Sequence, residues 1–256
     1  MALNKFKQLT NPLINYLGES KIAKKFSDIP IIIGGCGRSG TTLLLAILDA
    51  HSNIFGIPIE IGQFTEWDMV DGKLLPRRMD RLNRYIIGHK IPETCTRWCE
   101  KTPKNVLHYK KILNYCRGKI KIINLVRDGR DVLLSRHPED PHKYWVPINR
   151  WVNDIKLGLE VKNLPQIHTL RYEDLIADYN NAITGICNFL NEKVTDQILN
   201  WFEHTKVRKN TAWFQPARQM YTQSIGKWKK KEFESRVKEI MDHPEVPVLL
   251  KQLEYI

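Results

Sequence analysis

Glycine, hydroxyl and basic residues gather in one short segment near residue 35. Residues 31–33 are β-branched and uncharged, which indicates a buried strand, and residues 41–48 read as an apolar helix. A strand, a glycine loop and a helix in this order cradle a phosphate, because backbone N–H groups converge on the anion and the helix N-terminus adds about half a positive charge. The residues that would form this cradle are Gly35, Gly37, Arg38, Ser39, Gly40, Thr41 and Thr42.

The register of this loop separates it from the loops that bind nucleoside triphosphates. Those loops read Gly, four residues, Gly, Lys and then Ser or Thr. Gly35, Gly40 and Thr42 have this spacing. Thr41 stands in the lysine position, and the basic residue lies three positions earlier, at Arg38. The loop therefore predicts a ligand that contains a phosphate group. It does not predict the ATP reactions of ordinary kinases and ATPases, which need the missing lysine. A small-molecule kinase of the P-loop class, and a glycine turn that merely joins a strand to a helix, remain as alternatives.

A second candidate phosphate site follows residues 120–126, which read as another buried strand. Arg127 directly follows the last residue of this strand, so its guanidinium can bind a phosphate through two N–H groups. A turn follows, and a helix that begins near residue 130 would carry Ser135 on its second turn, within reach of the same phosphate. Two phosphate sites on two strand ends predict a nucleotide that is phosphorylated in two places.

These segments resemble the sulfotransferases that use 3′-phosphoadenosine 5′-phosphosulfate (PAPS), and the resemblance covers roughly residues 29–230. Residues 35–44 are similar to the 5′-phosphosulfate loop of the bacterial and tyrosylprotein-type branch, which has arginine where the cytosolic branch has lysine. In this family an arginine and a serine eight residues later hold the 3′-phosphate, and Arg127 and Ser135 have that spacing. Residues 224–228 resemble the C-terminal loop that closes on the adenosine and its 3′-phosphate, which adds Gly226, Lys227 and Trp228 to the expected binding site.

The resemblance also implies the catalytic residues, which are Glu60, Arg38 and Lys101. Sulfotransferases of this branch carry a glutamate just after the second strand as general base, and Glu60 follows an apolar run, with Glu66 in reserve. Lys101 ends a short strand before Pro103, in a Glu-Lys-Thr-Pro segment similar to a recurrent one in this branch. On the residues alone, Glu60 reads as a solvated loop carboxylate, and Lys101 reads equally well as a surface lysine.

The implied reaction moves a sulfuryl group from PAPS to a hydroxyl or amine acceptor by in-line displacement, leaving 3′,5′-ADP. By analogy with phosphoryl transfer, positioning and charge stabilisation would do most of the work. A metal is not required, because the departing oxygen belongs to a diester-like phosphate. A small alcohol, a saccharide and an acidic peptide all remain open as acceptors.

The composition favours an anionic ligand. The 256 residues include 40 Lys and Arg against 28 Asp and Glu, a formal charge of +12, which suits a multiply phosphorylated nucleotide, nucleic acid, an anionic membrane or an acidic polymer. A basic nucleic-acid-binding protein would use the lysine run 227–231 with Trp228 for stacking. The nucleic-acid-binding interpretation does not explain the two candidate phosphate sites at strand ends, so no nucleic-acid partner is expected.

Several absences in the sequence favour the cytoplasm. No apolar run reaches transmembrane length, and residues 1–28 lack the pattern of a signal peptide. The five cysteines have irregular spacing, which suggests a reducing compartment.

Strands near residues 31, 57, 98, 121 and 168 alternate with helices, which predicts one α/β domain over residues 1–256. We expect a P-loop-like fold with a mainly parallel central sheet flanked by helices, and with the second strand beside the first. Residues 1–28 are expected to form a helical arm broken at Pro12, and residues 204–231 a lid and 3′-phosphate loop. His51, just past the helix that follows the glycine loop, is expected to be structural. Further helices are expected over residues 76–88, 145–164, 182–190, 196–202, 232–241 and 246–253.

Overall fold

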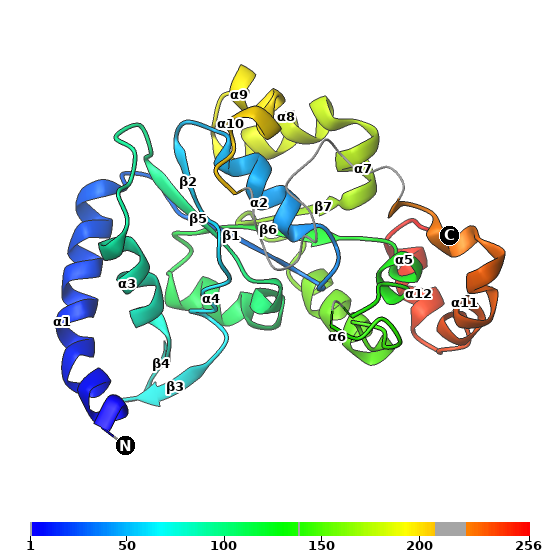
Figure 1. The fold of residues 1–256 in the computed structure, drawn as a ribbon, viewed down its shortest axis with the longest axis horizontal. Coiled ribbons are helices and arrows are strands. Elements are labelled where there is room, and N and C mark those ends of the chain that lie inside the picture. Colours follow the sequence, from blue (N-terminus) through cyan, green and yellow to red (C-terminus); the bar gives the residue numbers. More distant parts are fainter. Residues whose placement is uncertain (1, 138, 208–223) are drawn as a thin grey trace.

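A five-stranded parallel sheet forms the centre of the molecule, in the order β2-β5-β1-β6-β7 (Figure 1). The computed structural model describes residues 2–137, 139–207 and 224–256, with side chains from residue 11 onward. The strands of this sheet are β1 (Ile31–Gly35), β2 (Ile54–Ile57), β5 (Arg97–Lys101), β6 (Lys121–Val126) and β7 (Ile167–Arg171). Helices cover both faces of the sheet, which confirms the predicted α/β fold.

β1 lies in the middle of the sheet and is buried along its whole length. Ile31 and Ile33 pack into the core on one face, while Ile32 packs into the core on the other, as the two-residue period of a strand requires. Gly35 ends the strand with φ at 137°, where a Cβ atom would lie 2.2 Å from the Leu125 carbonyl oxygen. Glycine is therefore required at the point where β1 leaves the sheet.

The strand order differs from the prediction in one respect, since β2 does not lie beside β1. β5 pairs with β1, and β2 pairs with the outer side of β5. All five residues of β5 are buried, which suits an interior strand, whereas β2 has four residues and leaves Phe55 partly exposed. β2 therefore lies at the edge of the sheet, and β5 lies between β2 and β1.

Three groups of helices bury the sheet. On one face, α2 packs with α7, α8, α9 and α10, and on the other, α1 packs with α3, η1 and α4. A third core, centred on Trp151, joins α5, α6, α11 and α12 at the end of the molecule that holds the C-terminus (Figure 1). Their bounds are α1 Ala2–Lys25, α2 Thr41–Asp49, α3 Met79–Gly88, η1 Pro103–His108, α4 Tyr109–Tyr115, α5 Gly129–Leu133, α6 Ile148–Leu159, α7 Tyr172–Ala177, α8 Tyr179–Leu190, α9 Asp196–Leu199, α10 Trp201–His204, η3 Lys227–Lys229, η4 Lys231–Phe233, α11 Glu234–Met241 and α12 Val246–Gln252.

Prolines and polar residues shift some helix boundaries from their predicted places. α1 continues through Pro12, so the expected break there is wrong. α6 begins only at Ile148, because Pro147 holds an extended conformation before it. Asn200 divides the helix expected over residues 196–202 into α9 and α10.

A two-stranded hairpin, β3 (Trp67–Val70) and β4 (Lys73–Pro76), was not predicted. Its turn residues Asp71 and Gly72 have φ at 47° and 72°. Asp-Gly between short strands is a strong hairpin signal, because both central residues of such a turn need a positive φ. The hairpin follows the segment that contains Glu60 and Glu66.

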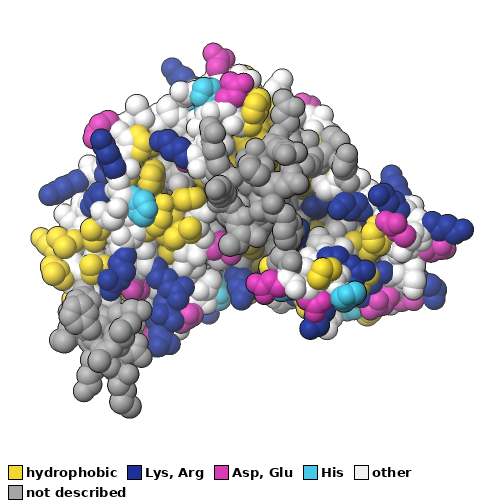
Figure 2. Space-filling view, viewed as in Figure 1, with side chains coloured by type: hydrophobic (Ala, Val, Ile, Leu, Met, Phe, Trp, Pro, Cys, Tyr) yellow, Lys and Arg dark blue, Asp and Glu magenta, His cyan; other side chains and the backbone are white. Residues whose placement is uncertain are grey.

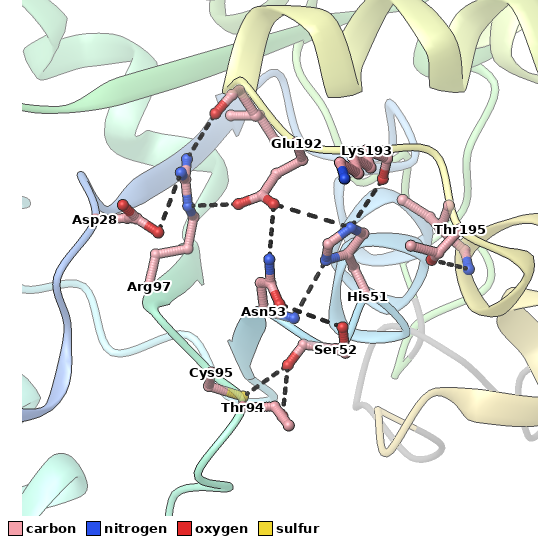
Figure 3. Close-up of polar contacts among 12 residues, drawn as sticks. Asp28, His51, Ser52, Asn53, Thr94, Cys95, Arg97, Glu192, Lys193 and Thr195 are labelled. Atoms are coloured by element: carbon pink, nitrogen blue, oxygen red, sulfur yellow. Dashed lines mark hydrogen bonds and ion pairs between the residues drawn. The ribbon is translucent and has the colours of Figure 1, made fainter.

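A buried polar network anchors the end of α2 that is remote from the glycine loop (Figure 3). His51 Nε2 lies 3.0 Å from the Lys193 carbonyl oxygen, and His51 Nδ1 accepts a hydrogen bond from Asn53 N at 3.2 Å. Glu192 forms an ion pair with Arg97 at the start of β5, at 3.0 Å. These contacts join α2, β5 and the turn after α8, which gives His51 the structural role that was predicted.

We expect Gly35→Ala to lower the free energy of unfolding by at least about 2 kcal/mol, because the methyl group meets the β6 backbone at a strained φ. Gly88→Ala is the matched control, since a Cβ atom at residue 88 meets nothing within 4 Å. Alanine there should leave stability unchanged or raise it by up to about 1 kcal/mol. Urea unfolding measures both values, and a loss at residue 35 as small as the change at residue 88 would contradict this packing.

Candidate active site

Three strand ends meet at one edge of the sheet. β5, β1 and β6 are parallel neighbours, so their carboxyl ends lie on the same side. Ile33 lies beside Lys101 in the register. Gly35 lies beside Leu125, two residues before Arg127. Open parallel sheets bind ligands at this edge, where the strand order reverses, so the fold brings together the glycine loop, Lys101 and Arg127.

The glycine loop has a constrained backbone. Arg38 and Gly40 both have a left-handed conformation, with φ at 70° and 93°, which costs a residue other than glycine about 1 kcal/mol. A Cβ atom at Gly40 would lie 2.4 Å from the Tyr172 ring. Ser39 is fully buried, and no partner for its Oγ is found in the described part of the chain. A strained arginine and an unsatisfied hydroxyl just before α2 are features of an anion site.

The two arginines of the predicted phosphate sites lie on the same side of the sheet. Arg127 donates from one guanidinium nitrogen to the Arg38 carbonyl oxygen at 3.1 Å. Burial, and then the positive charge of Arg127, lower the pKa of the Arg38 guanidinium. Two neighbouring cations that repel each other in a half-buried position favour the binding of an anion between them.

Residues 224–228 close over this pair from the C-terminal part of the chain. Arg127 donates to the Ser224 carbonyl oxygen at 2.5 Å, and its guanidinium lies 4.5 Å from the centre of the Tyr172 ring. The pKa of Lys227 lies below its ordinary value, because the ammonium group is partly removed from water and faces Arg127. Three cations, those of Arg38, Arg127 and Lys227, therefore influence one another at this edge of the sheet.

Ser135 lies outside the position that was predicted for it. α5 ends at Leu133, so Ser135 follows the helix instead of standing on its second turn. Leu134 caps the helix, which has only five residues. Ser135 Oγ lies 3.4 Å from the Asp131 carbonyl oxygen, which keeps its hydroxyl near α5.

Glu60 and Lys101 form an ion pair at the carboxyl ends of β2 and β5. Lys101 Nζ lies 2.5 Å from Glu60 Oε1. The side chain of Lys101 is 1% exposed, whereas that of Glu60 is 47% exposed. Lys101 is therefore not a surface lysine. The ion pair fixes Oε1 of Glu60, while the side chain of Glu60 remains accessible to solvent.

Glu66, the alternative to Glu60, has different partners. It forms ion pairs with Arg78 at 3.1 Å and with Arg77 at 3.9 Å, across the β3–β4 hairpin. The hydrogen bond from Arg78 lowers the pKa of the Glu66 carboxyl. Glu66 is thus held by the hairpin, whereas Glu60 pairs with Lys101 at the carboxyl end of β5, so position favours Glu60 over Glu66.

A buried network supports the Glu60–Lys101 pair from behind, and sequence reasoning missed it. Glu100 is completely buried and accepts hydrogen bonds from Thr102, from Asn105 at 3.0 Å and from Gln63 at 3.3 Å. Burial raises the pKa of the Glu100 carboxyl, and these hydrogen bonds partly offset the rise. Asn105 also donates to the Ile33 carbonyl oxygen at 3.2 Å, so the network ties β5 to β1 and to the loop after β2.

The first residues of α5 include two further candidate site residues, Arg130 and Asp131, whose contacts could not be predicted from the sequence. Asp131 accepts hydrogen bonds from the backbone N–H groups of Gly226 at 2.7 Å and Trp228 at 3.2 Å. Arg130 lies 3.6 Å from the centre of the Trp228 ring and forms an ion pair with Asp128 at 2.7 Å. Their charges were visible in the sequence, but their partners Gly226 and Trp228 lie about a hundred positions away in the chain.

Charged side chains of both signs are mixed over the face that Figure 2 shows, around the grey atoms, which are not described. The described side chains on this face form no continuous basic stripe of the kind that follows a nucleic-acid backbone. The described residues contain no helix that is long and apolar enough to cross a membrane.

A family comparison covers most of the chain, including every residue placed at this edge of the sheet. Residues 28–244 match the family model for the sulfotransferase domain. The chain belongs to the sulfotransferase family. The transfer of a sulfuryl group is therefore its reaction class, and neither the kinase nor the nucleic-acid-binding alternative is favoured.

Curated relatives of this sulfotransferase include a putative protein-tyrosine sulfotransferase of Caenorhabditis briggsae, which is 29% identical over 196 residues, 68% of this chain and 69% of the relative. The rat protein sulfotransferase 2A6 is 28% identical over 115 residues, 36% of this chain and 40% of that protein. The rat match spans less than half of either protein, whereas the nematode match spans more than two thirds of both.

Solved structures show the same fold. The sulfotransferase domain from the curacin biosynthetic pathway has a TM-score of 0.54 at 19% identity, and the match covers 90% of this chain and 99% of that domain. Mouse sulfotransferase SULT7A1, solved in complex with PAP, has a TM-score of 0.54 at 16% identity, and the match covers 94% of this chain and 95% of the mouse chain.

Proposed function

We propose that this sulfotransferase takes its sulfuryl group from PAPS and binds the nucleotide at both its 5′ and 3′ ends. The observation that carries the proposal is the contact of the Arg127 guanidinium with the backbone of Arg38, which joins the residue after β6 to the glycine loop after β1. The lowered pKa values of Arg38 and Lys227 fit this ligand, because phosphate groups would relieve the repulsion among the three cations. PAP, the nucleotide in the mouse structure, is 3′,5′-ADP, which is PAPS without its sulfuryl group.

The two ends of the nucleotide have separate sets of residues. On the 5′ side, Arg38 and the N–H groups of residues 37–42 bind the transferring sulfuryl group and the phosphate that departs. On the 3′ side, Arg127, Ser135 and Lys227 bind the phosphate. Gly226 and Trp228 belong to the segment that closes on the adenosine. PAPS itself supplies an activated sulfuryl group on a phosphate leaving group.

Glu60 acts on the acceptor, and its ion-pair partner Lys101 acts on the departing phosphate. The Glu60 carboxylate takes the proton of the acceptor hydroxyl or amine as the new bond to sulfur forms and the bond from sulfur to the phosphate oxygen breaks. Lys101 fixes the direction of Glu60 through their ion pair, and its ammonium group stabilises the charge that develops on the departing phosphate. The products are the sulfated acceptor and 3′,5′-ADP.

Glu60→Gln is expected to lower the turnover number by about 10²- to 10⁴-fold, because the amide keeps the shape of the side chain but cannot accept the proton. Glu66→Gln is the matched control and should change turnover by less than about threefold, since Glu66 pairs with arginines of the hairpin. Steady-state rates across a pH series measure both variants. Normal turnover of Glu60→Gln over the whole series would remove Glu60 as the base.

The reaction itself is tested with radiolabelled PAPS and a panel of acceptors: a phenol, an aliphatic alcohol, an amine, an oligosaccharide and an acidic tyrosine-containing peptide. Label should pass to at least one acceptor class with release of 3′,5′-ADP, and the class that is labelled identifies the natural acceptor. The same panel with radiolabelled ATP and Mg²⁺ should yield no labelled product. Transfer from ATP, with none from PAPS, would overturn the proposal.

The proposal treats residues 1–256 as one sulfotransferase domain, with an N-terminal helical arm over residues 1–28. Residues 204–231 would serve as the lid and the 3′-phosphate loop, of which residues 208–223 lie outside the described residues. We also propose the cytoplasm as its location. All five cysteines are free thiols, which fits a reducing compartment.

A further inference from the structure

Residues 127–131, which follow β6 and include the start of α5, make several of the described contacts of segment 224–228, and Tyr172 adds another to Ser224. Arg127 binds the Ser224 carbonyl oxygen at 2.5 Å, Arg130 stacks on the Trp228 ring at 3.6 Å, and Asp131 binds two backbone N–H groups. Residues 127–131, which carry one proposed 3′-phosphate ligand, Arg127, therefore also bind the segment that carries another, Lys227.

Asp131 makes the most direct of these contacts. Its side chain is 3% exposed, and both carboxylate oxygens are used: Oδ2 accepts from Gly226 N at 2.7 Å and Oδ1 from Trp228 N at 3.2 Å. The two N–H groups lie on either side of Lys227. A buried carboxylate that accepts two backbone hydrogen bonds fixes a backbone strongly, because charged acceptors form shorter and stronger bonds.

The backbone between these two bonds has an unusual conformation. Gly226 has φ at 73°, and a Cβ atom there would meet only the Lys229 side chain, at 3.8 Å. Glycine is therefore present for its left-handed conformation and not for lack of space. Next to this residue, the charges of Arg127 and Arg38 contribute to lowering the pKa of Lys227, so its ammonium group lies within reach of their repulsion.

The carboxylate of Asp131 offsets part of that repulsion. It lies close enough to raise the pKa of Lys227, against the opposite effects of burial and Arg127. Arg127 in turn lowers the pKa of Asp131, which burial raises. Asp131 thus acts on Lys227 in two ways, through the backbone and through its charge.

We propose that Asp131 is a positioning residue that sets the selectivity of this protein for a 3′-phosphorylated nucleotide, by holding the backbone on both sides of Lys227. Asp131 itself does not touch the phosphate, because its two oxygens are occupied by backbone N–H groups. The inference rests on the proposed binding of PAPS. Loss of Asp131 should therefore weaken the recognition of the 3′-phosphate and leave the 5′ site intact.

The test compares the affinities for 3′,5′-ADP and 5′-AMP by calorimetry, in the full-length wild type and in Asp131→Asn. The asparagine has the same size but only one acceptor oxygen, so one N–H group loses its partner. We expect the dissociation constant for 3′,5′-ADP to rise about 10- to 100-fold, while that for 5′-AMP changes by less than about threefold. Asp174→Asn, at a 59% exposed carboxylate of α7, is the matched control and should change neither value.

A second variant, Gly226→Ala, reaches the same backbone without touching Asp131. Alanine destabilises the left-handed conformation at residue 226. This variant should therefore also weaken the binding of 3′,5′-ADP and leave the binding of 5′-AMP nearly unchanged. If Asp131→Asn does not fold, as judged by its thermal transition, Gly226→Ala decides the question alone. An equal loss of affinity for both nucleotides, or no loss of affinity for either, would overturn the inference. If the wild type binds 3′,5′-ADP no better than 5′-AMP, the proposed function fails instead.

Discussion

Replacing Arg38 with alanine is expected to lower the rate of sulfuryl transfer by at least about 10³-fold, the range of other arginines that stabilise a transferring group. The structure gives the reason, since Arg38 is held in a strained conformation in the glycine loop, with its carbonyl oxygen bound by Arg127. Strain of this kind persists where the surrounding structure fixes a side chain for function. The rate is measured with saturating PAPS and the acceptor found in the panel.

Two controls interpret this result. Arg77→Ala removes a 59% exposed arginine of the β3–β4 hairpin and should leave the rate within about threefold of the wild type. Arg38→Lys keeps the charge but loses the planar guanidinium, so its rate should lie between those of the alanine variant and the wild type. A near-normal rate for Arg38→Ala would rule Arg38 out of the transfer step.

Replacing Arg127 with alanine is expected to abolish the preference for a 3′-phosphate. The dissociation constant for 3′,5′-ADP should rise by about 10²-fold or more, because a bidentate contact between arginine and phosphate is lost. The constant for 5′-AMP should rise far less, although Arg127 also contacts the backbones of Arg38 and Ser224. Calorimetric titration of the two nucleotides into the variant measures both constants.

Because Arg127 is almost buried, its loss also threatens stability. Arg127→Lys keeps a positive charge at this position but cannot bind through two N–H groups. It should show an intermediate preference for 3′,5′-ADP. If Arg127→Ala and Arg127→Lys both keep the full wild-type preference, Arg127 does not bind the 3′-phosphate.

The sequence predicted those parts of the fold and site that local patterns determine. The buried strand, glycine loop and apolar helix of residues 31–49 lie within a few residues of one another, and the structure has them as β1 and α2. Arg127 was placed correctly, directly after the end of β6, because the apolar strand before it is also a local pattern. Asp71-Gly72 was an equally local signal, and the hairpin that it forms could have been predicted.

Features that depend on contacts between distant segments were not predictable in this way. Whether β2 or β5 lies beside β1 depends on which strand is better buried, and that follows from the whole sheet. The burial of Lys101 depends on Glu60, which lies 41 positions away. The role of Asp131 depends on Gly226, 95 positions away. Ser135 was misplaced because α5 ends at Leu133, after five residues, and nothing local in the sequence marks that end.

The central claim is that one nucleotide is held by two phosphate sites on neighbouring strand ends, and titration of the wild-type protein with 3′,5′-ADP, 5′-AMP and 3′-AMP tests it directly. We predict that 3′,5′-ADP binds at least about 100-fold more tightly than either singly phosphorylated nucleotide, because only it satisfies Arg38 and Arg127 together. Equal affinities for 3′,5′-ADP and 5′-AMP would contradict the claim.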